Sequence, residues 1–211
     1  MKIALINENS QASKNKIIYD ALKEVADKKG YEVINFGMYG DVDEESITYV
    51  QAGLLTAILL NSKVVDFVVT GCGTGEGAML AANSFPNVIC GHISDPSDAY
   101  MFSQINDGNA VAIPFAKGFG WGAELNLRYM FEKLFEEESG GGYPKERAVP
   151  EKANKKILDE VKKVTYVDFI DILKNIDRNL LLGVLNLLKF KEYFFENSKD
   201  EKLNEFFKSI M

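Results

Sequence analysis

The chain has 211 residues, of which 46% are hydrophobic and 26% are charged, and its formal net charge is −7. This length fits one domain with a small appendage, and the acidic balance argues against the lysine- and arginine-rich surfaces on which non-specific nucleic-acid binding depends. Two cysteines and one histidine exclude a disulfide framework and most histidine-rich metal sites, and without a signal peptide or an apolar stretch of ~20 residues we expect a cytoplasmic protein that does not bind membranes.

Strand and helix patterns alternate along the first two-thirds of the chain. We expect strands at 3–7, 31–36, 64–70, 88–91 and 110–113, and helices at 14–29, 44–62, 78–83, from Ser94-Asp95-Pro96 onward, and at 120–137. This alternation predicts βαβ units and a doubly wound, Rossmann-like α/β fold with a five-stranded parallel sheet. In such sheets ligands bind beyond the carboxyl ends of the strands, where the loops after Asn7, Thr70 and Gly91 lie.

A glycine-rich segment at 139–144 ends this alternating pattern. After it we expect four helices, at 152–163, 166–176, 179–195 and 201–210, and no strand. We therefore predict an α/β domain at 1–150 and an all-helical C-terminal extension at 151–211. The extension has clear apolar faces, which it must bury on the α/β domain, on itself or on a second subunit.

The segment Gly71-Cys72-Gly73-Thr74-Gly75-Glu76-Gly77 joins the third expected strand to a helix. Glycines let the backbone approach a ligand closely, and free N–H groups at a helix start favour an anion such as a phosphate. The same N–H groups lower the pKa of a thiol, so Cys72 is a candidate for catalysis rather than an ordinary buried cysteine. Cys90, inside an expected strand, is by contrast expected to be structural.

Other residues near this segment leave alternatives open. Glu76 either stabilises the helix start or serves as a general base or an orienting partner of the thiol. The glycines also partly match a dinucleotide fingerprint, with Asp95 about 20 residues downstream, so a nucleotide-binding oxidoreductase is an alternative function. His92 is by default a hydrogen-bonded filler, and Lys117 and Arg147 are by default solvated charges. An anion site in this acidic chain must nevertheless recruit such cations.

Several short motifs together resemble the ribose-5-phosphate isomerase B and galactose-6-phosphate isomerase family, over about residues 1–150. They are Gly71-Cys72-Gly73-Thr74-Gly75, Ala81-Ala82-Asn83, Ser103-Gln104-Ile105-Asn106-Asp107-Gly108-Asn109, and Gly141-Gly142 with Arg147. The resemblance implies an aldose–ketose isomerase that moves a proton between neighbouring carbons of a sugar phosphate through an enediolate, with no metal or organic cofactor. It implies Cys72 as the base, with Glu76 as the alternative.

The resemblance also implies binding roles for the other candidate residues. The loop backbone at Gly73, Gly75 and Gly77 would hold the developing oxyanion, with support from Thr74. Substrate binding is implied for Asn106, and for Glu8 and Asn9, which replace an Asp-His pair of the family. It is also implied for Arg147, which matches a phosphate-binding arginine, and for Lys117, which lies next to the position of a second such arginine. Because the partner subunit of a dimer commonly contributes the asparagine, we expect a homodimer or a dimer of dimers with a shared site. A silent or heteromeric partner subunit of such an isomerase is the alternative.

Two departures from the family pattern bear on the substrate. Ile105 replaces a histidine that is assigned to opening the sugar ring, and Tyr143 replaces a phosphate-binding arginine. Isoleucine cannot carry a proton, so either His92 takes over ring opening or the substrate has no ring to open. We therefore expect a short or open-chain sugar phosphate, such as a tetrulose phosphate, rather than ribose 5-phosphate.

Overall fold

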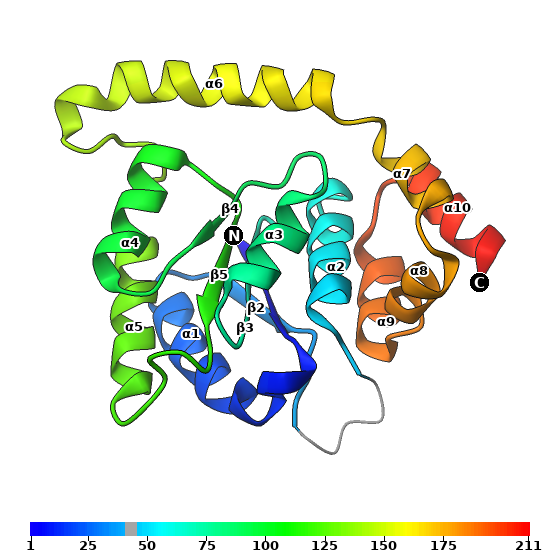
Figure 1. Ribbon diagram of the computed structural model, residues 1–211, viewed down its shortest axis with the longest axis horizontal. Coiled ribbons are helices and arrows are strands. Elements are labelled where there is room, and N and C mark those ends of the chain that lie inside the picture. The colour runs from blue at the N-terminus through cyan, green and yellow to red at the C-terminus, as the bar shows by residue number, and fades with distance from the viewer. Residues whose placement is uncertain (41–45) are drawn as a thin grey trace.

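The alternating pattern folds into a five-stranded parallel sheet with helices on both faces, which confirms the predicted fold class (Figure 1). The computed structural model describes residues 1–40 and 46–211. The strands are β1 (Lys2–Asn7), β2 (Glu32–Asn35), β3 (Phe67–Cys72), β4 (Cys90–His92) and β5 (Ala110–Pro114), in the order β2-β1-β3-β5-β4. All neighbouring pairs are parallel, so every strand ends at one edge of the sheet, which we call the carboxyl edge. The opposite edge is called the amino edge.

The two faces of the sheet carry separate hydrophobic cores because successive side chains of a strand point to opposite faces. On β1, Ala4 and Ile6 face the first core, whereas Ile3 and Leu5 face the second. The first core packs against α2 (Tyr49–Asn61) and α3 (Glu76–Asn83), and the second against α1 (Asn15–Lys28), α4 (Pro96–Met101) and α5 (Ala123–Leu134). The helices that follow β1 and β3 therefore lie on opposite faces. A reversal of this kind marks the place where doubly wound sheets bind ligands.

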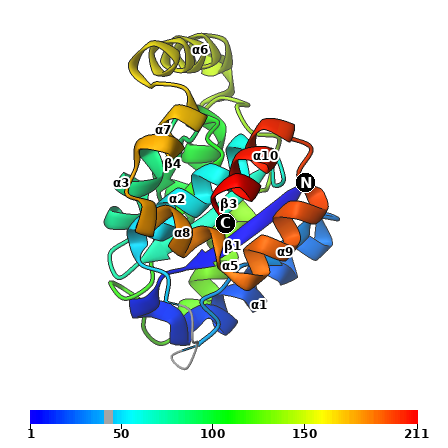
Figure 2. The same ribbon diagram turned by 90° about the vertical axis from the view of Figure 1, so that its right-hand side faces the viewer.

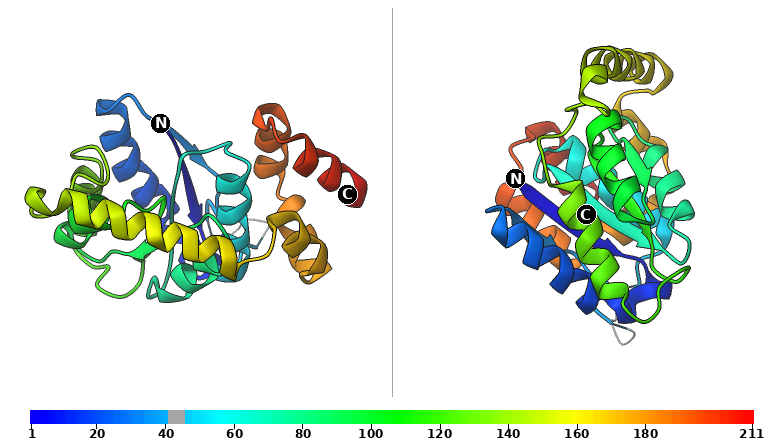
Figure 3. Two further views of the ribbon diagram at one scale, coloured as in Figure 1. Left: turned by 90° about the horizontal axis from the view of Figure 1, so that it is seen from above. Right: turned by 90° about the vertical axis from the view of Figure 1, so that its left-hand side faces the viewer.

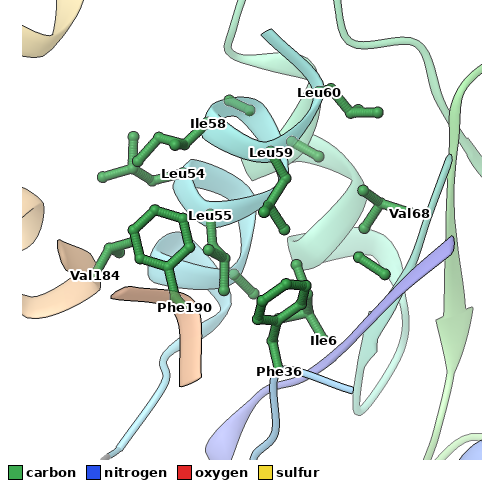
Figure 4. Close-up of a cluster of buried hydrophobic side chains, with 14 of the residues drawn as sticks. Ile6, Phe36, Leu54, Leu55, Ile58, Leu59, Leu60, Val68, Val184 and Phe190 are labelled. Atoms are coloured by element: carbon green, nitrogen blue, oxygen red, sulfur yellow. The ribbon is translucent and has the colours of Figure 1, made fainter. Parts of the chain in front are cut away.

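Helix α2 is buried along most of its length because it is covered from two sides. Its residues 52–60 are all buried. The sheet covers one side, and the C-terminal helices cover the other: α7 (Phe169–Asn175), α8 (Arg178–Leu185), α9 (Leu188–Asn197) and α10 (Glu201–Ile210). Figure 4 shows Val184 and Phe190 of this extension beside Leu54 and Leu55 of α2. Helices α7 to α10 thus bury their apolar faces on the α/β domain and on one another.

Helix α6 (Ala148–Thr165) lies along the upper side of the molecule in Figure 1, and Figures 2 and 3 show it standing off from the sheet. Of its 18 residues only Glu151 is buried. Ile157, Val161 and Val164 are 61%, 47% and 84% exposed, and their spacing places them on one face of the helix. The helix therefore presents an apolar face to solvent. None of the helices within residues 1–40 and 46–211 is long and apolar enough to cross a membrane.

Two helix boundaries differ from those expected. The helix expected at 179–195 is in fact two helices, α8 and α9, because the buried Leu187 between them has a non-helical backbone, with a φ of −59° and a ψ of 115°. The helix expected to start at 44 starts at Tyr49, because Thr48 and Gln51 form a capping box there. Residues 44 and 45 of the expected helix lie outside the described residues. The boundary predicted between 150 and 151 falls inside α6.

The third strand also differs from its expected range of 64–70. It begins at Phe67 and continues through Gly71 to Cys72, because these last residues pair with Ile113 and Pro114 of β5. The thiol therefore belongs to the end of a strand rather than to a free turn. A strand end in the middle of a sheet holds its side chain in a fixed direction, as catalysis requires.

Candidate active site

Cys72 lies at the carboxyl edge, at the end of the central strand β3. It pairs with Pro114, and its carbonyl oxygen accepts a hydrogen bond from the N–H of Phe115 at 2.8 Å. Its thiol is half-buried and forms no disulfide, whereas Cys90 is buried. The thiol of Cys72 is therefore accessible to a ligand at the edge where doubly wound sheets bind them.

The loop after β3 requires glycine at two positions for the fold itself. A Cβ atom on Gly71 would overlap the carbonyl oxygen of Ile113. Gly75 has a φ of +80°, and a Cβ atom there would lie 2.8 Å from the ring of His92. Gly73 differs, because the nearest atoms beyond its chain neighbours would be 3.8 and 3.9 Å from a Cβ atom. The fold therefore does not need glycine at this third position, where a methyl group would make only ordinary van der Waals contacts.

The start of α3 places further predicted residues at the carboxyl edge. Glu76 is the first residue of α3, which starts two residues before the expected range of 78–83, and is exposed. Its N–H lies 3.4 Å from the hydroxyl oxygen of Thr74, which is also exposed. A Cβ atom on Gly77 would lie 3.3 Å from the ring of Tyr49, so the first residue of α2 packs against this turn. Tyr49 is a neighbour of the site that the sequence patterns do not single out.

His92 is the last residue of β4, and its side chain contacts the loop after β3. Its Nε2 lies 2.9 Å from the carbonyl oxygen of Thr74. Because a carbonyl oxygen can only accept, Nε2 carries the proton and donates it. The ring nitrogen that faces the loop is therefore already used, and His92 is a structural support of the Cys72 loop.

The loop after β1 contains a hydrogen-bond network at the same edge. Glu8 is only 4% exposed, and its carboxylate accepts hydrogen bonds from the N–H and the hydroxyl of Ser10. The amide of Gln11 donates to the same hydroxyl at 3.0 Å and accepts from the ammonium of Lys14 at 2.7 Å. Asn9 is exposed, and its amide donates to the hydroxyl of Ser46 at 3.1 Å. The predicted residues Glu8 and Asn9 thus lie at the right edge, where their contact with substrate stays a prediction.

Lys14 joins the loop after β1 to the segment after β5. Its ammonium donates to the carbonyl oxygen of Phe115 and lies 4.7 Å from the centre of the Phe119 ring. The amide nitrogen of Gln11 lies 3.9 Å from the point where a Cβ atom on Gly73 would stand. The sequence patterns do not single out Gln11 or Lys14, although both follow one of the strand ends predicted to reach this edge.

Lys117 lies in the loop after β5, at the carboxyl edge, and its contact with substrate stays a prediction. Its backbone N–H donates to the carbonyl oxygen of Gly73 at 2.9 Å. Its exposed side chain lines a cavity of about 200 Å³ together with His92, Ser94 and Asn126. The carboxyl edge therefore carries the lysines Lys14 and Lys117 near the Cys72 loop.

Asn106 and Arg147 lie at the amino edge, on the other side of the sheet from Cys72. Asn106 ends a π-helical turn (Phe102–Asn106) that precedes β5, whereas Cys72 pairs with Pro114 at the end of β5. At roughly 3.3 Å per strand residue, the length of β5 separates them by about 16 Å. A single chain therefore does not bring all predicted site residues together.

The charge of Arg147 is paired within the chain. Its Nε lies 3.2 Å from a carboxylate oxygen of Glu151, which is 8% exposed. The other oxygen of Glu151 accepts from the N–H of Tyr143 at 3.1 Å. The tyrosine that replaces an arginine of the family packs edge-on against Tyr100, with ring centres 5.9 Å apart. This edge therefore offers less positive charge to a phosphate than the family pattern implies.

Two residues weighed from the sequence have structural roles. The carboxylate of Asp95 caps α4, and hydrogen bonds from the Ser97 hydroxyl and from backbone N–H groups hold the pKa of Asp95 below its usual range. Asp95 is therefore occupied as a helix cap, which weakens the dinucleotide interpretation. Burial raises the pKa of the Cys90 thiol to about 12, as expected for a structural cysteine. No group of three or more His, Cys, Asp or Glu side chains in the described part of the chain could hold a metal ion.

Comparison with known proteins identifies relatives along the whole chain. A sequence model described as ribose/galactose isomerase matches residues 3–139, and one described as ribose-5-phosphate isomerase matches residues 164–210. A solved structure of a 4-deoxy-L-threo-5-hexosulose-uronate ketol-isomerase complexed with a tartrate is 63% identical, with a TM-score of 0.97, and the match covers 100% of this chain and 99% of that one. A ribose-5-phosphate isomerase from Vibrio parahaemolyticus is 48% identical, with a TM-score of 0.96 and the same coverage. A ribose-5-phosphate isomerase B from Clostridium thermocellum is 28% identical, with a TM-score of 0.59, over 79% of this chain and 100% of that one.

These matches confirm the resemblance and the class of enzyme. The first sequence model spans the strands and the Cys72 loop, and the two relatives that match the whole chain include its helical extension. The protein is therefore an isomerase of the aldose–ketose type. It belongs to the ribose/galactose isomerase family.

Proposed function

We propose that the protein isomerises an open-chain uronate of the 4-deoxy-L-threo-5-hexosulose-uronate type, from its aldose to its ketose form. The observation that carries this proposal is the 63% identity, over the whole chain, with a ketol-isomerase named for that compound. That relative binds tartrate, which carries carboxylates and hydroxyls, the same groups as a uronate. The proposal keeps the open chain expected from the sequence and replaces the phosphate with a carboxylate.

The missing ring-opening histidine supports this substrate. The compound has a ketone at carbon 5 and no hydroxyl at carbon 4, so it lacks the hydroxyls that close a sugar ring on carbon 1. An enzyme for it needs no ring-opening acid, which fits Ile105. His92 is the other candidate for that task, but its Nε2 already donates to the Thr74 carbonyl oxygen.

The charges at the amino edge also favour a carboxylate over a phosphate. A phosphate dianion is usually bound by several arginine contacts, because the planar guanidinium matches its oxygens. Here Tyr143 stands at one arginine position, and Glu151 pairs with Arg147 at the other. The amino edge is therefore poorly suited to a phosphate dianion.

The reaction would run on the Cys72 loop. The thiolate of Cys72 takes the proton from carbon 2, and the electrons of that C–H bond form the enediolate with the carbon 1 carbonyl. The thiol then delivers a proton, its own or one exchanged with solvent, to carbon 1 while the hydroxyl proton of carbon 2 moves to the oxygen on carbon 1, which leaves a ketone at carbon 2. Loop N–H groups at Gly73 and Gly75, with Thr74, stabilise the negative oxygen. Glu76 is the alternative base.

A second copy of the chain would complete this site. Asn106 and Arg147 lie about 16 Å or more from the Cys72 end of the sheet, so they reach a substrate there only from another chain. The exposed apolar face of α6, the helix that directly follows Arg147, offers a surface for such a partner. We therefore propose a homodimer with shared sites, rather than a silent subunit.

A phosphorylated open-chain sugar is the second candidate. The relative from Vibrio parahaemolyticus matches the whole chain at 48% identity and is described as a ribose-5-phosphate isomerase. Ribose 5-phosphate and erythrose 4-phosphate therefore belong in the same assay.

The test is turnover of the purified protein on three substrates, with the product identified by NMR. We expect the highest kcat/KM on 4-deoxy-L-threo-5-hexosulose-uronate, and at least about 100-fold less on ribose 5-phosphate and erythrose 4-phosphate, because ill-matched polar groups reduce transition-state binding strongly. Faster turnover of either phosphate would refute the uronate proposal and leave the family assignment intact.

A further inference from the structure

We propose that Lys14 binds the carboxylate of the substrate and thereby determines that the enzyme accepts a uronate. This inference rests on the proposed function and names the residue that recognises the anionic end of the molecule. Neither the family motifs nor the predicted site residues include Lys14.

The position of Lys14 places its charge close to the backbone of the strand end that carries the thiol. The loop after β1 and the end of β3 adjoin each other, at the point where the chain reverses its winding. The ammonium of Lys14 donates to the carbonyl oxygen of Phe115, whose own N–H donates to the carbonyl oxygen of Cys72 at 2.8 Å. One residue thus links the cation to the strand end that carries the thiol.

The ammonium of Lys14 is held by neutral groups. Its partners are the amide oxygen of Gln11 at 2.7 Å, the carbonyl oxygen of Phe115 and the ring face of Phe119. Within residues 1–40 and 46–211 no carboxylate forms an ion pair with it. The nearby carboxylate of Glu8 instead accepts from Ser10. The positive charge therefore stays uncompensated in a half-buried place, where it attracts an anion more strongly than in bulk water.

Gly73 brings the Cys72 loop close to the residue that holds Lys14. A Cβ atom on Gly73 would stand 3.9 Å from the amide nitrogen of Gln11, the residue that also holds the lysine. In a uronate the carboxylate is only a few bonds from the carbons that exchange the proton, so its cation must lie near the thiol. An ammonium has three N–H donors, of which two are used here, and the third remains for a ligand.

Lys117 is the competing cation at this edge, and its side chain is less well fixed. In the described residues no hydrogen bond or ion pair holds its ammonium, whereas that of Lys14 has two hydrogen bonds and an aromatic ring. A charge that is already positioned loses less conformational entropy when it binds a ligand. We therefore assign the carboxylate to Lys14 rather than to Lys117.

The test compares Lys14→Met, Lys14→Arg and Lys16→Met with the wild-type protein. Lys16 is a matched control, since it is exposed two residues away and pairs with Asp20. Each protein is assayed for kcat and KM on 4-deoxy-L-threo-5-hexosulose-uronate and on its uncharged methyl ester, and for inhibition by tartrate. Circular dichroism and thermal unfolding show that each variant is folded.

We expect Lys14→Met to raise KM for the uronate about 10- to 100-fold, which is the usual range for a lost hydrogen bond to a charged group. Tartrate inhibition weakens by a similar factor, kcat changes little, and Lys14→Arg restores most of the affinity. On the methyl ester Lys14→Met behaves like wild type, because that substrate carries no charge to recognise.

Two results would overturn the assignment, and they differ from failure of the proposed function. In one, Lys14→Met and Lys16→Met have the same KM for the uronate. In the other, Lys14→Met weakens the ester as much as the acid. If the wild-type protein does not turn over the uronate at all, the proposed function fails, and the role of Lys14 fails with it before any variant is assayed.

Discussion

The two edges of the sheet carry different halves of the chemistry. The carboxyl edge holds the thiol of Cys72, its glycine loop and the lysines Lys14 and Lys117. The amino edge holds Asn106 and Arg147, and there the arginine is paired with Glu151. The first edge can carry out proton transfer, whereas the second can only bind and orient.

This division follows from the parallel sheet. Residues that follow strands gather at one edge, and residues that precede strands gather at the other. Asn106 precedes β5, so no rearrangement within one chain brings it to Cys72. We therefore expect each active site to use the carboxyl edge of one chain for proton transfer and the amino edge of the partner chain to orient the substrate.

The largest expected effect is the loss of proton transfer in Cys72→Ala. Removing a general base costs about 10²- to 10⁴-fold in rate, and exchange of the substrate proton with deuterated solvent should fall by that factor while tartrate still binds. Cys90→Ala is the matched control, since its thiol is buried and protonated at neutral pH. Exchange that persists in Cys72→Ala and disappears in Glu76→Gln would identify the glutamate as the base.

Mixed dimers test the division between the edges directly. Cys72→Ala and Asn106→Ala should each be nearly inactive alone. Suppose that a site takes its thiol from one chain and its asparagine from the other. After subunit exchange in an equal mixture, half of the dimers contain one chain of each variant, and each of these has one intact site of two. The mixture should then recover about a quarter of the wild-type activity. An inactive mixture, despite exchange shown by mass spectrometry of labelled chains, would place both residues of a site in one chain.

A pair of glycine variants separates fold from chemistry at the carboxyl edge. Gly71→Ala should destabilise the protein by about 3 kcal/mol or more, because its methyl group overlaps the carbonyl oxygen of Ile113. Gly73→Ala should keep the melting temperature within a few degrees yet lower kcat/KM by about 10- to 100-fold, because its methyl group displaces the substrate. Thermal unfolding and turnover are measured together. Full activity in Gly73→Ala would mean that the substrate does not approach this face of the loop.

The smallest effect concerns the apolar face of α6. The double variant with Ile157→Glu and Val161→Glu should leave the fold of each chain intact, since both side chains are exposed in the single chain. We expect a shift toward monomer in size-exclusion chromatography with light scattering, and a loss of activity of several-fold at assay concentrations. Leu125→Glu on α5, which is 43% exposed, is the control and should change neither. A variant that stays dimeric would place the interface elsewhere.

The sequence predicts which strands end at the carboxyl edge better than it predicts the side chains that gather around them. Hydrophobic runs, several of them bounded by glycine residues, locate all five strands, so Cys72 and His92 are expected just beyond the ends of two of them. Lys14 is not expected, because its importance depends on a contact with Phe115, 101 residues away. The break at Leu187 is hidden by a continuous apolar pattern, which a turn between two helices satisfies equally well. Local sequence patterns thus predict helices and strands, whereas contacts between loops that are distant in sequence become visible only in the structure.

The exposed face of α6 has a consequence for how the enzyme behaves on dilution. A helix with so little burial gains little stability from packing within its own chain. If a partner covers it and also completes the site, specific activity must fall as the protein is diluted below its dissociation constant. In the same range α6 should become the first segment that proteases cleave.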